Sequence, residues 1–380
     1  MKRFITIIAV ALLLFARICA QAPSSYSIVI LGDTHYDTEP ASVYHSHYIE
    51  KVEWLNKVQR AEFARNGEMW RERCPRLMER ASQLIEKDTR MVIQLGDLIQ
   101  GDCGNGEVHQ QMLDDAMNNF KKQLGNLPLV TVVGNHDIRG TDAEAAYRSY
   151  MPKRMSAELG QKIEKTTFAF WIGKDAYIVV DFNKPDDQEI ERLLEETKLA
   201  RYTFVIIHGT LLPPDENSCR WFFHGKEKER EKRLHFRRLF AQRNVICLCG
   251  HTHRTGIADW WGDGGRITQF NANSVWSKKR QGEYTILSQG PETYGEMRKN
   301  YKNDDGTPIK DESALFEEYR PGLKTYINSP SAGSYRMKVS KRGVTIDFYA
   351  GDSQKPSAHF VIRGEVSSPS RLAHLISQKA

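Results

Sequence analysis

The sequence contains little that would hold it in a membrane. Among its 380 residues, the apolar run at 4–15 is shorter than the roughly 20 residues that a spanning helix needs. Lys2 and Arg3 precede this run and small residues follow it near Ala20, which is the pattern of a secretory signal peptide. We therefore expect residues 1–20 to be removed on export, leaving no stable membrane anchor and a periplasmic or secreted chain. An uncleaved anchor or a core helix is the alternative.

The sequence also lacks a strong excess of charge of one sign. It has 54 Lys and Arg against 48 Asp and Glu, and the three basic residues of the first twenty reduce this to 51 against 48 when they are removed. Such a balance does not argue for nucleic acid as a partner. The run KEKEREKR at 226–233 alternates in sign, which is typical of the solvated start of a helix.

Cysteines are few, which limits the disulfides that the chain can form. Of the six, one lies within residues 1–20, so five remain and at least one thiol has no partner within the chain. One disulfide can form among Cys74, Cys103 and Cys219, because an exported protein resides where disulfides persist. Cys247 and Cys249 alternate in an apolar segment, so we expect them to be small core residues.

What is present indicates a soluble globular α/β protein, with 40% hydrophobic and 27% charged residues. Apolar, β-branched segments predict strands at 26–31, 91–95, 129–133, 167–172, 175–181, 203–207 and 245–249. Helical periodicity predicts helices at 49–66, 76–87, 108–124, 186–199 and 228–243. Because strands and helices alternate, we expect an α/β sheet covered on both faces.

After residue 250 the pattern changes to β structure. Strands are predicted at 255–261, 265–271, 334–340 and 344–349, and the last two form a hairpin. Residues 276–333 have no strong period, so we expect a long irregular insertion there, which is either a lid over the substrate or a surface excursion. We predict one domain over residues 24–365, with the hairpin rejoining its sheet, and a tail over 366–380.

Five of the predicted strands end in side chains that can bind a metal ion. The groups are Gly32-Asp33-Thr34-His35, Gly96-Asp97, Gly134-Asn135-His136-Asp137, His208-Gly209 and Gly250-His251-Thr252-His253. A Gly-Asp pair alone is ordinary turn chemistry. Asp-x-His and His-x-His are more specific, because two donors two residues apart can face one ion. All five groups follow strands, and that edge of an α/β sheet is where ligands bind.

The residue types indicate which ions would bind. Imidazole and carboxylate ligands suit Mn, Fe or Zn, and the absence of Cys from the set argues against a structural zinc site. The candidate ligands are Asp33, His35, Asp97, Asn135, His208, His251 and His253. These are too many for one ion, whereas two ions sharing Asp97 would use them all. Two metals roughly 3.5–4 Å apart stabilise displacement at phosphorus, and a hydroxide between them is the natural nucleophile.

These groups, in this order over residues 26 to about 275, resemble the calcineurin-like metallophosphoesterase family. The resemblance implies a two-sheet sandwich flanked by helices, with the metal site at the C-terminal ends of strands. It implies that Asp33, His35 and His253 hold one divalent ion. It also implies that Asn135, His208 and His251 hold the other, and that Asp97 bridges the two.

The resemblance assigns His136 a catalytic role away from the metals. In this family that histidine faces the phosphate and stabilises charge or protonates the leaving oxygen. We expect the second catalytic residue, Asp137, to orient His136 and to raise its pKa by placing a carboxylate beside the imidazolium.

Departures from related families narrow the activity. Purple acid phosphatases have Tyr where this chain has Gln100 and Gly where it has His35, so an iron–tyrosinate centre is not expected. Periplasmic nucleotidases of the superfamily have Glu at the position of Asp137 and a large C-terminal domain for which this chain has no room. Double-strand-break nucleases share the metal motifs, but the signal peptide and balanced charge argue against that role.

Other residues could select the substrate. The candidates are His45 and His47 near Tyr44 and Tyr48, the pair Trp260 and Trp261, and Asn271 and Asn273. Adjacent residues of a strand point to opposite faces, so at most one of the two tryptophans would contact substrate.

We therefore predict an exported hydrolase of phosphomonoesters or phosphodiesters that acts on a small substrate with two divalent metal ions. A non-catalytic scaffold of the same fold and a nuclease are the alternatives. The sequence leaves the oligomeric state open.

Overall fold

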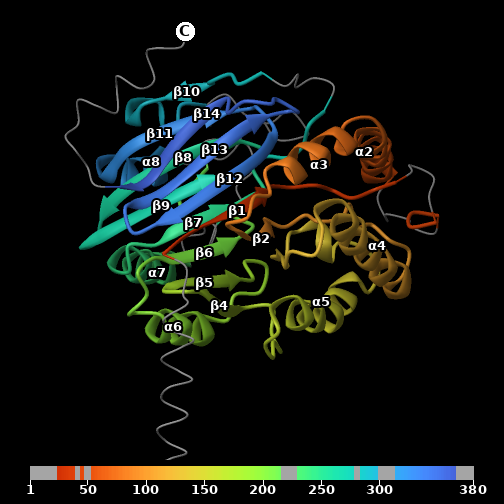
Figure 1. Cartoon of the computed structure of the whole chain (residues 1–380), viewed down its shortest axis with the longest axis horizontal. Helices are drawn as coiled ribbons and strands as arrows, with labels where there is room; N and C mark the ends of the chain where they lie inside the picture. The colour runs from red at the N-terminus through yellow and green to blue at the C-terminus, as the bar shows by residue number, and fades with distance from the viewer. Residues whose placement is uncertain are drawn as a thin grey trace, which may run out of the picture.

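The computed structural model describes residues 24–38, 43–46, 53–214, 229–277, 283–297 and 313–364. Its strands form two sheets, shown in Figure 1. The six-stranded sheet has the order β14(Ala358–Gly364), β13(Gly343–Ala350), β12(Gly333–Ser340), β1(Ser25–Leu31), β2(Thr89–Gln94), β3(Leu129–Thr131). The eight-stranded sheet has the order β10(Ser288–Gln289), β11(Leu323–Ser329), β8(Thr255–Gly262), β9(Gly265–Asn271), β7(Ile246–Cys249), β6(Thr203–Ile207), β5(Asp175–Val180), β4(Phe168–Ile172).

Helices cover the outer face of each sheet. Those on the six-stranded sheet are α2(Glu53–Glu72), α3(Cys74–Gln83), α4(Gly106–Leu124) and α5(Ala143–Leu159). Those on the eight-stranded sheet are α6(Asp187–Glu196), α7(Arg230–Gln242) and α8(Ser313–Tyr319). The expected fold class is therefore confirmed: two mixed sheets packed together with helices outside.

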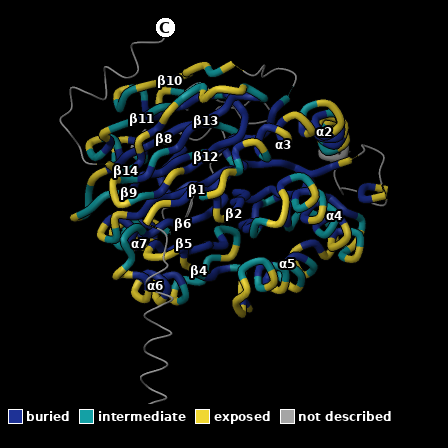
Figure 2. The backbone as a smooth tube through the Cα atoms, viewed as in Figure 1, coloured by how far each residue is buried: buried dark blue, intermediate teal, exposed yellow. Residues whose placement is uncertain are grey.

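Strand alternation divides the apolar side chains between two cores, seen as the buried interior in Figure 2. On β6, Phe204 and Ile206 belong to the core between the sheets, whereas Val205 and Ile207 pack under α6 and α7. Every side chain of this strand is buried, and all of its residues after Thr203 are apolar. A strand covered on both faces is rigid, so the loop that follows it has a fixed position.

The parallel strands bring the loops with polar residues to one edge. β1, β2 and β3 pair in parallel in one sheet, and β5, β6 and β7 pair in parallel in the other. Parallel strands end at the same edge, so the residues after β1, β2, β3, β6 and β7 meet where the two sheets face one another. The position of the candidate site follows from this topology.

The structure confirms some of the expected elements and corrects others. β12 and β13 form the predicted hairpin, with Ser340 opposite Gly343. The expectation of an irregular insertion over 276–333 is wrong for its last part, because β11 pairs antiparallel with β8. Helix α5 and strand β14 were not predicted. Apolar and polar residues alternate only weakly along β11, and α5 contains a proline. The sequence of neither element therefore shows the strong period of a strand or a helix.

Several expectations concern residues 1–23 and 365–380, which lie outside the described ranges. The proposed signal peptide and the C-terminal tail are among them, and Cys219 lies in another undescribed range, 215–228. Within the described ranges, no helix is both long and apolar enough to cross a bilayer. Cys74 and Cys103 are buried free thiols, so they are not joined to each other, and Cys247 and Cys249 are buried core residues as expected.

Replacing Phe270 tests how much the core between the two sheets contributes to the stability of the fold. Phe270 lies on β9, is fully buried, and contacts Tyr335 and Phe360 of the other sheet at ring-centroid distances of 5.6 and 5.2 Å. Phe270→Ala should lower the free energy of unfolding by about 3–5 kcal/mol, because a buried cavity replaces the ring. Urea denaturation measures the change. Val361→Ala, at an exposed side chain, serves as control and should change it by less than about 0.5 kcal/mol.

Candidate metal centre

Two buried carboxylates, Asp33 and Asp97, lie at the centre of the site. Asp33 follows β1, and both its oxygens accept a hydrogen bond from the backbone N–H of His251 at 3.0 Å. Asp97 follows β2, and its Oδ1 accepts from the backbone N–H of His136 at 2.7 Å. Each carboxylate therefore connects two loops that are distant in the sequence, and these backbone contacts fix its orientation.

Four histidines surround these carboxylates. The Nε2 atoms of His35 and His253 are 3.2 Å apart, and His253 Nε2 is 3.7 Å from Asp33 Oδ1. On the other side, His208 Nε2 lies 3.3 Å from His251 Nδ1 and 3.2 Å from Asp97 Oδ2. His35 Nε2 is 3.9 Å from the same oxygen of Asp97. Asp97 is thus shared by both groups of donors.

The orientation and the missing partners of these donor atoms suit the binding of metal ions. His208 donates its Nδ1–H to the carbonyl of Leu95 at 2.7 Å, as metal-binding histidines commonly do. In a neutral ring the Nε2 lone pair then faces the Asp97 carboxylate, so a proton or a metal cation must lie between them. The Oδ1 atom of Asn135 is buried with no hydrogen-bond partner among the described residues. A buried amide oxygen without a partner is costly, and a cation would satisfy it.

Burial and the charges of neighbouring side chains shift the pKa values of the residues in the site. Burial raises the pKa of Asp33 to about 7. Burial would lower the pKa of His208, but the carboxylates of Asp97 and Asp33 raise it to about 9. Burial, with His136 beside it, lowers the pKa of His35 to about 3 and keeps that ring neutral, which is the form that binds metal. The raised pKa of His208 shows that the two buried carboxylates favour a positive charge between them, which a metal ion would also supply.

Unusual backbone conformations place the ligands. His35, Asp97, His251 and His253 all have left-handed φ values, of 45°, 48°, 66° and 50°. Non-glycine residues avoid this region, and such strain is concentrated at functional sites. Gly134 is required for a related reason, because a Cβ there would lie 2.1 Å from the backbone nitrogen and Oδ1 of Asp97. The glycines in the motifs thus admit a close approach between neighbouring loops.

His136 lies beside this cluster, with its ring edge-to-face against His35 at a centroid distance of 4.4 Å. The Nδ1–H of His136 donates to the carbonyl of Gln100 at 2.9 Å, which leaves Nε2 free of that contact. Burial, followed by the charge of Arg139, lowers the pKa of His136 to about 4.

The expected role of Asp137 is wrong. Its Oδ1 accepts from the backbone N–H of Ile99 at 3.1 Å, and its Oδ2 accepts from that of Gly134 at 2.8 Å. The carboxylate therefore holds the loop that carries His136, and it neither contacts the imidazole nor raises its pKa. The carbonyl of Gln100 sets the orientation of the ring instead. Consecutive residues in a tight turn point in different directions, which the sequence could not show.

A model of the calcineurin-like phosphoesterase family matches residues 26–255, which is more than half of the chain. The chain belongs to this family. The resemblance seen in the motifs is therefore confirmed, and the seven candidate ligands of this phosphoesterase belong to loops that the fold brings to one edge.

The solved structures that are similar share the fold at low sequence identity. A structure of PhoD has a TM-score of 0.51 and 11% identity, with 89% of this chain and 69% of that chain covered. GAP50, the anchor in the inner membrane complex of Plasmodium, has a TM-score of 0.47 and 11% identity, with 90% of each chain covered. A dimetal phosphatase from Danio rerio has a TM-score of 0.43 and 10% identity, with 89% and 99% covered. The search of curated proteins found no match.

The sequence did not indicate an ion-pair network that lies near the candidate site. Arg139 joins Asp102 and Glu62, with Nε 2.8 Å from Asp102 Oδ1 and Nη2 2.8 Å from Glu62 Oε2. Both carboxylates come within 4.8 Å of a ring nitrogen of His136. Glu62 lies on α2, distant from every motif, so no local pattern indicated it. The network fixes the segment 100–102, which supplies the carbonyl that orients His136.

The residues considered for substrate selection have mostly structural contacts. His45 is buried, stacked on Phe63 at 3.9 Å and bonded to Asp37 at 2.8 Å, whereas His47 lies outside the described residues. Trp260 is core, as expected for one of the pair, and its Nε1–H donates to the carbonyl of Tyr319. Trp261 is exposed at the far end of β8.

Of the two asparagines, Asn271 supports a loop that carries candidate ligands, and Asn273 supports the segment between β11 and β12. Asn271 donates to the hydroxyl of Thr252, between His251 and His253, at 3.0 Å. Asn273 Nδ2 donates to the carbonyl of Ser331 at 3.2 Å. Both side chains thus make loop contacts, as the turn chemistry of Asn allows.

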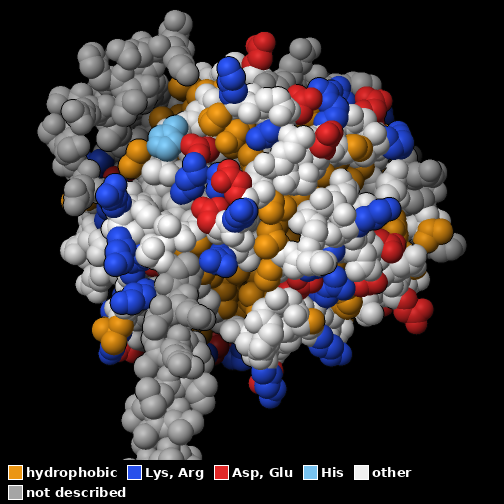
Figure 3. Space-filling view, viewed as in Figure 1, with side chains coloured by type: hydrophobic (Ala, Val, Ile, Leu, Met, Phe, Trp, Pro, Cys, Tyr) orange, Lys and Arg blue, Asp and Glu red, His pale blue; other side chains and the backbone are white. Residues whose placement is uncertain are grey.

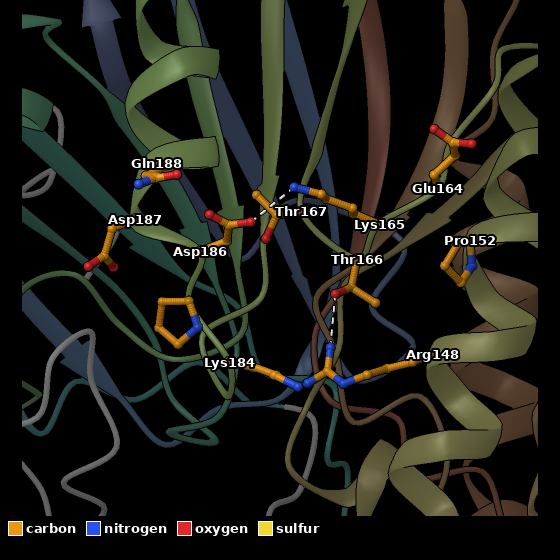
Figure 4. Close-up of a pocket in the computed structure, with 11 residues that line it drawn as sticks. Arg148, Pro152, Glu164, Lys165, Thr166, Thr167, Lys184, Asp186, Asp187 and Gln188 are labelled. Carbon is orange, nitrogen blue, oxygen red and sulfur yellow. Dashed lines mark hydrogen bonds and ion pairs between the residues drawn. The ribbon is translucent and has the colours of Figure 1, made fainter.

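A pocket of about 600 Å³ lies where β5 ends and β4 begins, and none of the seven candidate metal ligands is among the described residues that line it. Figure 4 shows Arg148 and Lys184 entering it with their charged ends toward one another. Phe182, which precedes the pocket along the chain, packs on the rings of His208 and His251 at 5.5 and 6.0 Å.

Gly134→Ala tests the close approach of the loops. The added Cβ would overlap Asp97, so we expect loss of metal from the purified protein and a free energy of unfolding lower by about 1–3 kcal/mol. Elemental analysis measures the metal content, and urea denaturation the stability. Gly106→Ala is the control, because its added Cβ would meet only side-chain atoms and the backbone of Asp142 at 3.2 Å or more. Full metal content in Gly134→Ala would contradict the role of that glycine.

Proposed function

We propose that this protein is an exported hydrolase of phosphomonoesters or phosphodiesters that depends on two divalent metal ions. The observation that carries the proposal is the convergence of two donor groups on one carboxylate, with ligand atoms of each group within 4.8 Å of one another. Membership of the calcineurin-like phosphoesterase family supports it. Export is inferred from residues 1–20 alone.

The proposed ligands are those expected from the sequence. Asp33, His35 and His253 would hold one ion, Asn135, His208 and His251 the other, and Asp97 would bridge them. Mn, Fe and Zn suit this set of imidazole and oxygen ligands. When bound, such a pair of ions polarises the phosphoester and lowers the pKa of a water ligand, which supplies the nucleophile.

We propose that His136 binds the phosphate or protonates the leaving oxygen through Nε2. Because the pKa of His136 is about 4 without substrate, the negative charge of a bound phosphate has to raise it so that Nε2 carries the proton. Its Nδ1–H is committed to the carbonyl of Gln100, so Nε2 is the nitrogen that can exchange a proton. The network of Glu62, Arg139 and Asp102 holds that carbonyl in place. Asp137 acts as a positioning residue, because it fixes the loop and does not contact the reacting group.

The first test compares a nitrophenyl phosphate monoester with the matching bis-ester. Signal-free protein is stripped of metal with a chelator and refilled with Mn, Zn or Fe. We expect activity only after refilling, and Asp97→Asn should lower kcat by more than about 100-fold, since loss of even an outer-shell partner of a metal ligand costs about 10- to 100-fold. The ratio of the two rates identifies the preferred ester. Two bound metals without hydrolysis of either ester would favour a non-catalytic scaffold.

The second test is His136→Ala in the refilled protein. We expect kcat to fall by about 10²–10⁴-fold with metal content unchanged, because the histidine assists proton transfer and does not hold an ion. His45→Ala, at a buried histidine bonded to Asp37, is the matched control for loss of an imidazole and should retain more of the activity. Normal turnover in His136→Ala with both metals bound would refute the assigned role.

A further inference from the structure

A second pocket, of about 670 Å³, lies at the amino ends of the parallel strands of the eight-stranded sheet, whereas the metal centre lies at their carboxyl ends. Thr203 lines it at the start of β6, whereas His208 follows the end of that strand. Asn244 lines it before β7, whereas His251 follows that strand. A strand rises about 3.3 Å per residue, so roughly 16 Å separates the two sites. A ligand in this pocket does not reach the metals.

The lining of this distal pocket is strongly basic. Its charged residues are Lys198, Arg201, Arg243, Arg266 and Arg363, and no Asp or Glu is among the described residues that line it. Behind the lining, Asp175 pairs with Arg201, Glu195 with Lys198 and Arg243, and Asp259 with Arg266. Three carboxylates thus face five cations, so an excess of positive charge remains. On the face drawn in Figure 3, Lys and Arg side chains gather at the left, where β5 and β6 begin in Figure 1.

Arg363 is the cation without a counter-ion. Its guanidinium donates to neutral oxygens only: the carbonyls of Asn244 at 2.9 Å, Val245 at 3.2 Å and Ile362 at 3.1 Å, and the hydroxyl of Thr268. Among the residues that the structure describes, no carboxylate forms an ion pair with it. Burial, and then the neighbouring charge of Arg266, lower the pKa of Arg363 to about 9. A partly buried cation in this state is stabilised by an anion.

Exposed apolar side chains adjoin these cations. The side chain of Trp261, which lines the pocket, is 48% exposed, and the Arg266 guanidinium stacks 5.2 Å from its ring centroid. Leu199, between the lining residues Lys198 and Ala200, is 90% exposed. Guanidinium groups bind phosphate by paired hydrogen bonds, and exposed Trp and Leu beside cations suit the interface of an anionic membrane.

We propose that the distal pocket binds a phosphate-bearing anion, with Arg266 as its principal hydrogen-bond donor and the charge of Arg363 beside it. The four terminal N–H groups of Arg363 already donate to protein oxygens, so only its Nε–H is left for the anion. The phosphate is either a free ion or the headgroup of a lipid, since both present the same oxygens to the guanidinium groups. The site is independent of the metal centre and of the hydrolytic function proposed above. Binding should weaken as the salt concentration rises, because exposed charges are screened.

Calorimetric titration of inorganic phosphate into the metal-containing full chain tests the free ion. We expect two binding sites, one lost in Asp97→Asn and the other weakened at least tenfold in Arg363→Gln. Arg363→Gln should retain wild-type hydrolysis of the nitrophenyl ester. The matched control is Arg76→Gln, at an exposed arginine of α3 that pairs with Asp352. It should leave both sites intact. Absence of the Asp97-dependent site alone would count against the proposed function and not against the distal pocket.

Sedimentation with vesicles distinguishes the lipid source. Phosphatidylcholine vesicles with and without phosphatidylglycerol are compared, and a headgroup site predicts binding to the anionic vesicles that Arg363→Gln and Trp261→Ala abolish. The double variant Lys198→Gln with Arg243→Gln, at side chains that solvent reaches, should weaken binding severalfold. It replaces Arg363→Gln in the test if that variant does not fold. Phosphate and vesicle binding that both stay unchanged in these variants would overturn the proposal.

Discussion

The carboxylate of Asp97 is the constraint on which the site depends. It is buried, its backbone is left-handed, and its side chain accepts the N–H of His136 while facing His208 and His35. Its own carbonyl accepts the backbone N–H of His35 at 2.9 Å, which draws in the loop after β1. One residue therefore connects the loops after β1, β2, β3 and β6. A buried carboxylate needs positive charge beside it, which His208 supplies when protonated and which a metal ion would supply when bound.

The environment of His136 shows how a reactive side chain is oriented without a charged partner. Gln100 provides the acceptor for Nδ1, and the ion pairs of Arg139 hold the segment that carries it. Asp137 works on the backbone of the same loop. The acidic residue that adjoins the histidine in sequence thus shapes the turn, and residues distant in sequence set the direction of the ring.

The two ends of the parallel strands carry opposite charge preferences. At their carboxyl ends, carboxylates and imidazoles form a site for cations. At their amino ends, five basic residues surround a pocket that suits an anion. β6 and β7 separate the two, and both strands are buried on both faces, so the two sites keep a fixed distance. The hydrolysis and the anion binding proposed above would therefore take place at opposite ends of the same strands.

The sequence by itself determined the fold class, most of the strands and the set of metal-binding candidates, because these depend on local periodicity and on short motifs next to strand ends. It could not determine β11, whose place is fixed by pairing with β8, nor the neighbours of His136, which come from α2 and the segment 100–102. The charge of the distal pocket was also hidden, since its cations lie on four separate segments. Only the tertiary structure decided these features, because they arise from contacts between residues far apart in the chain.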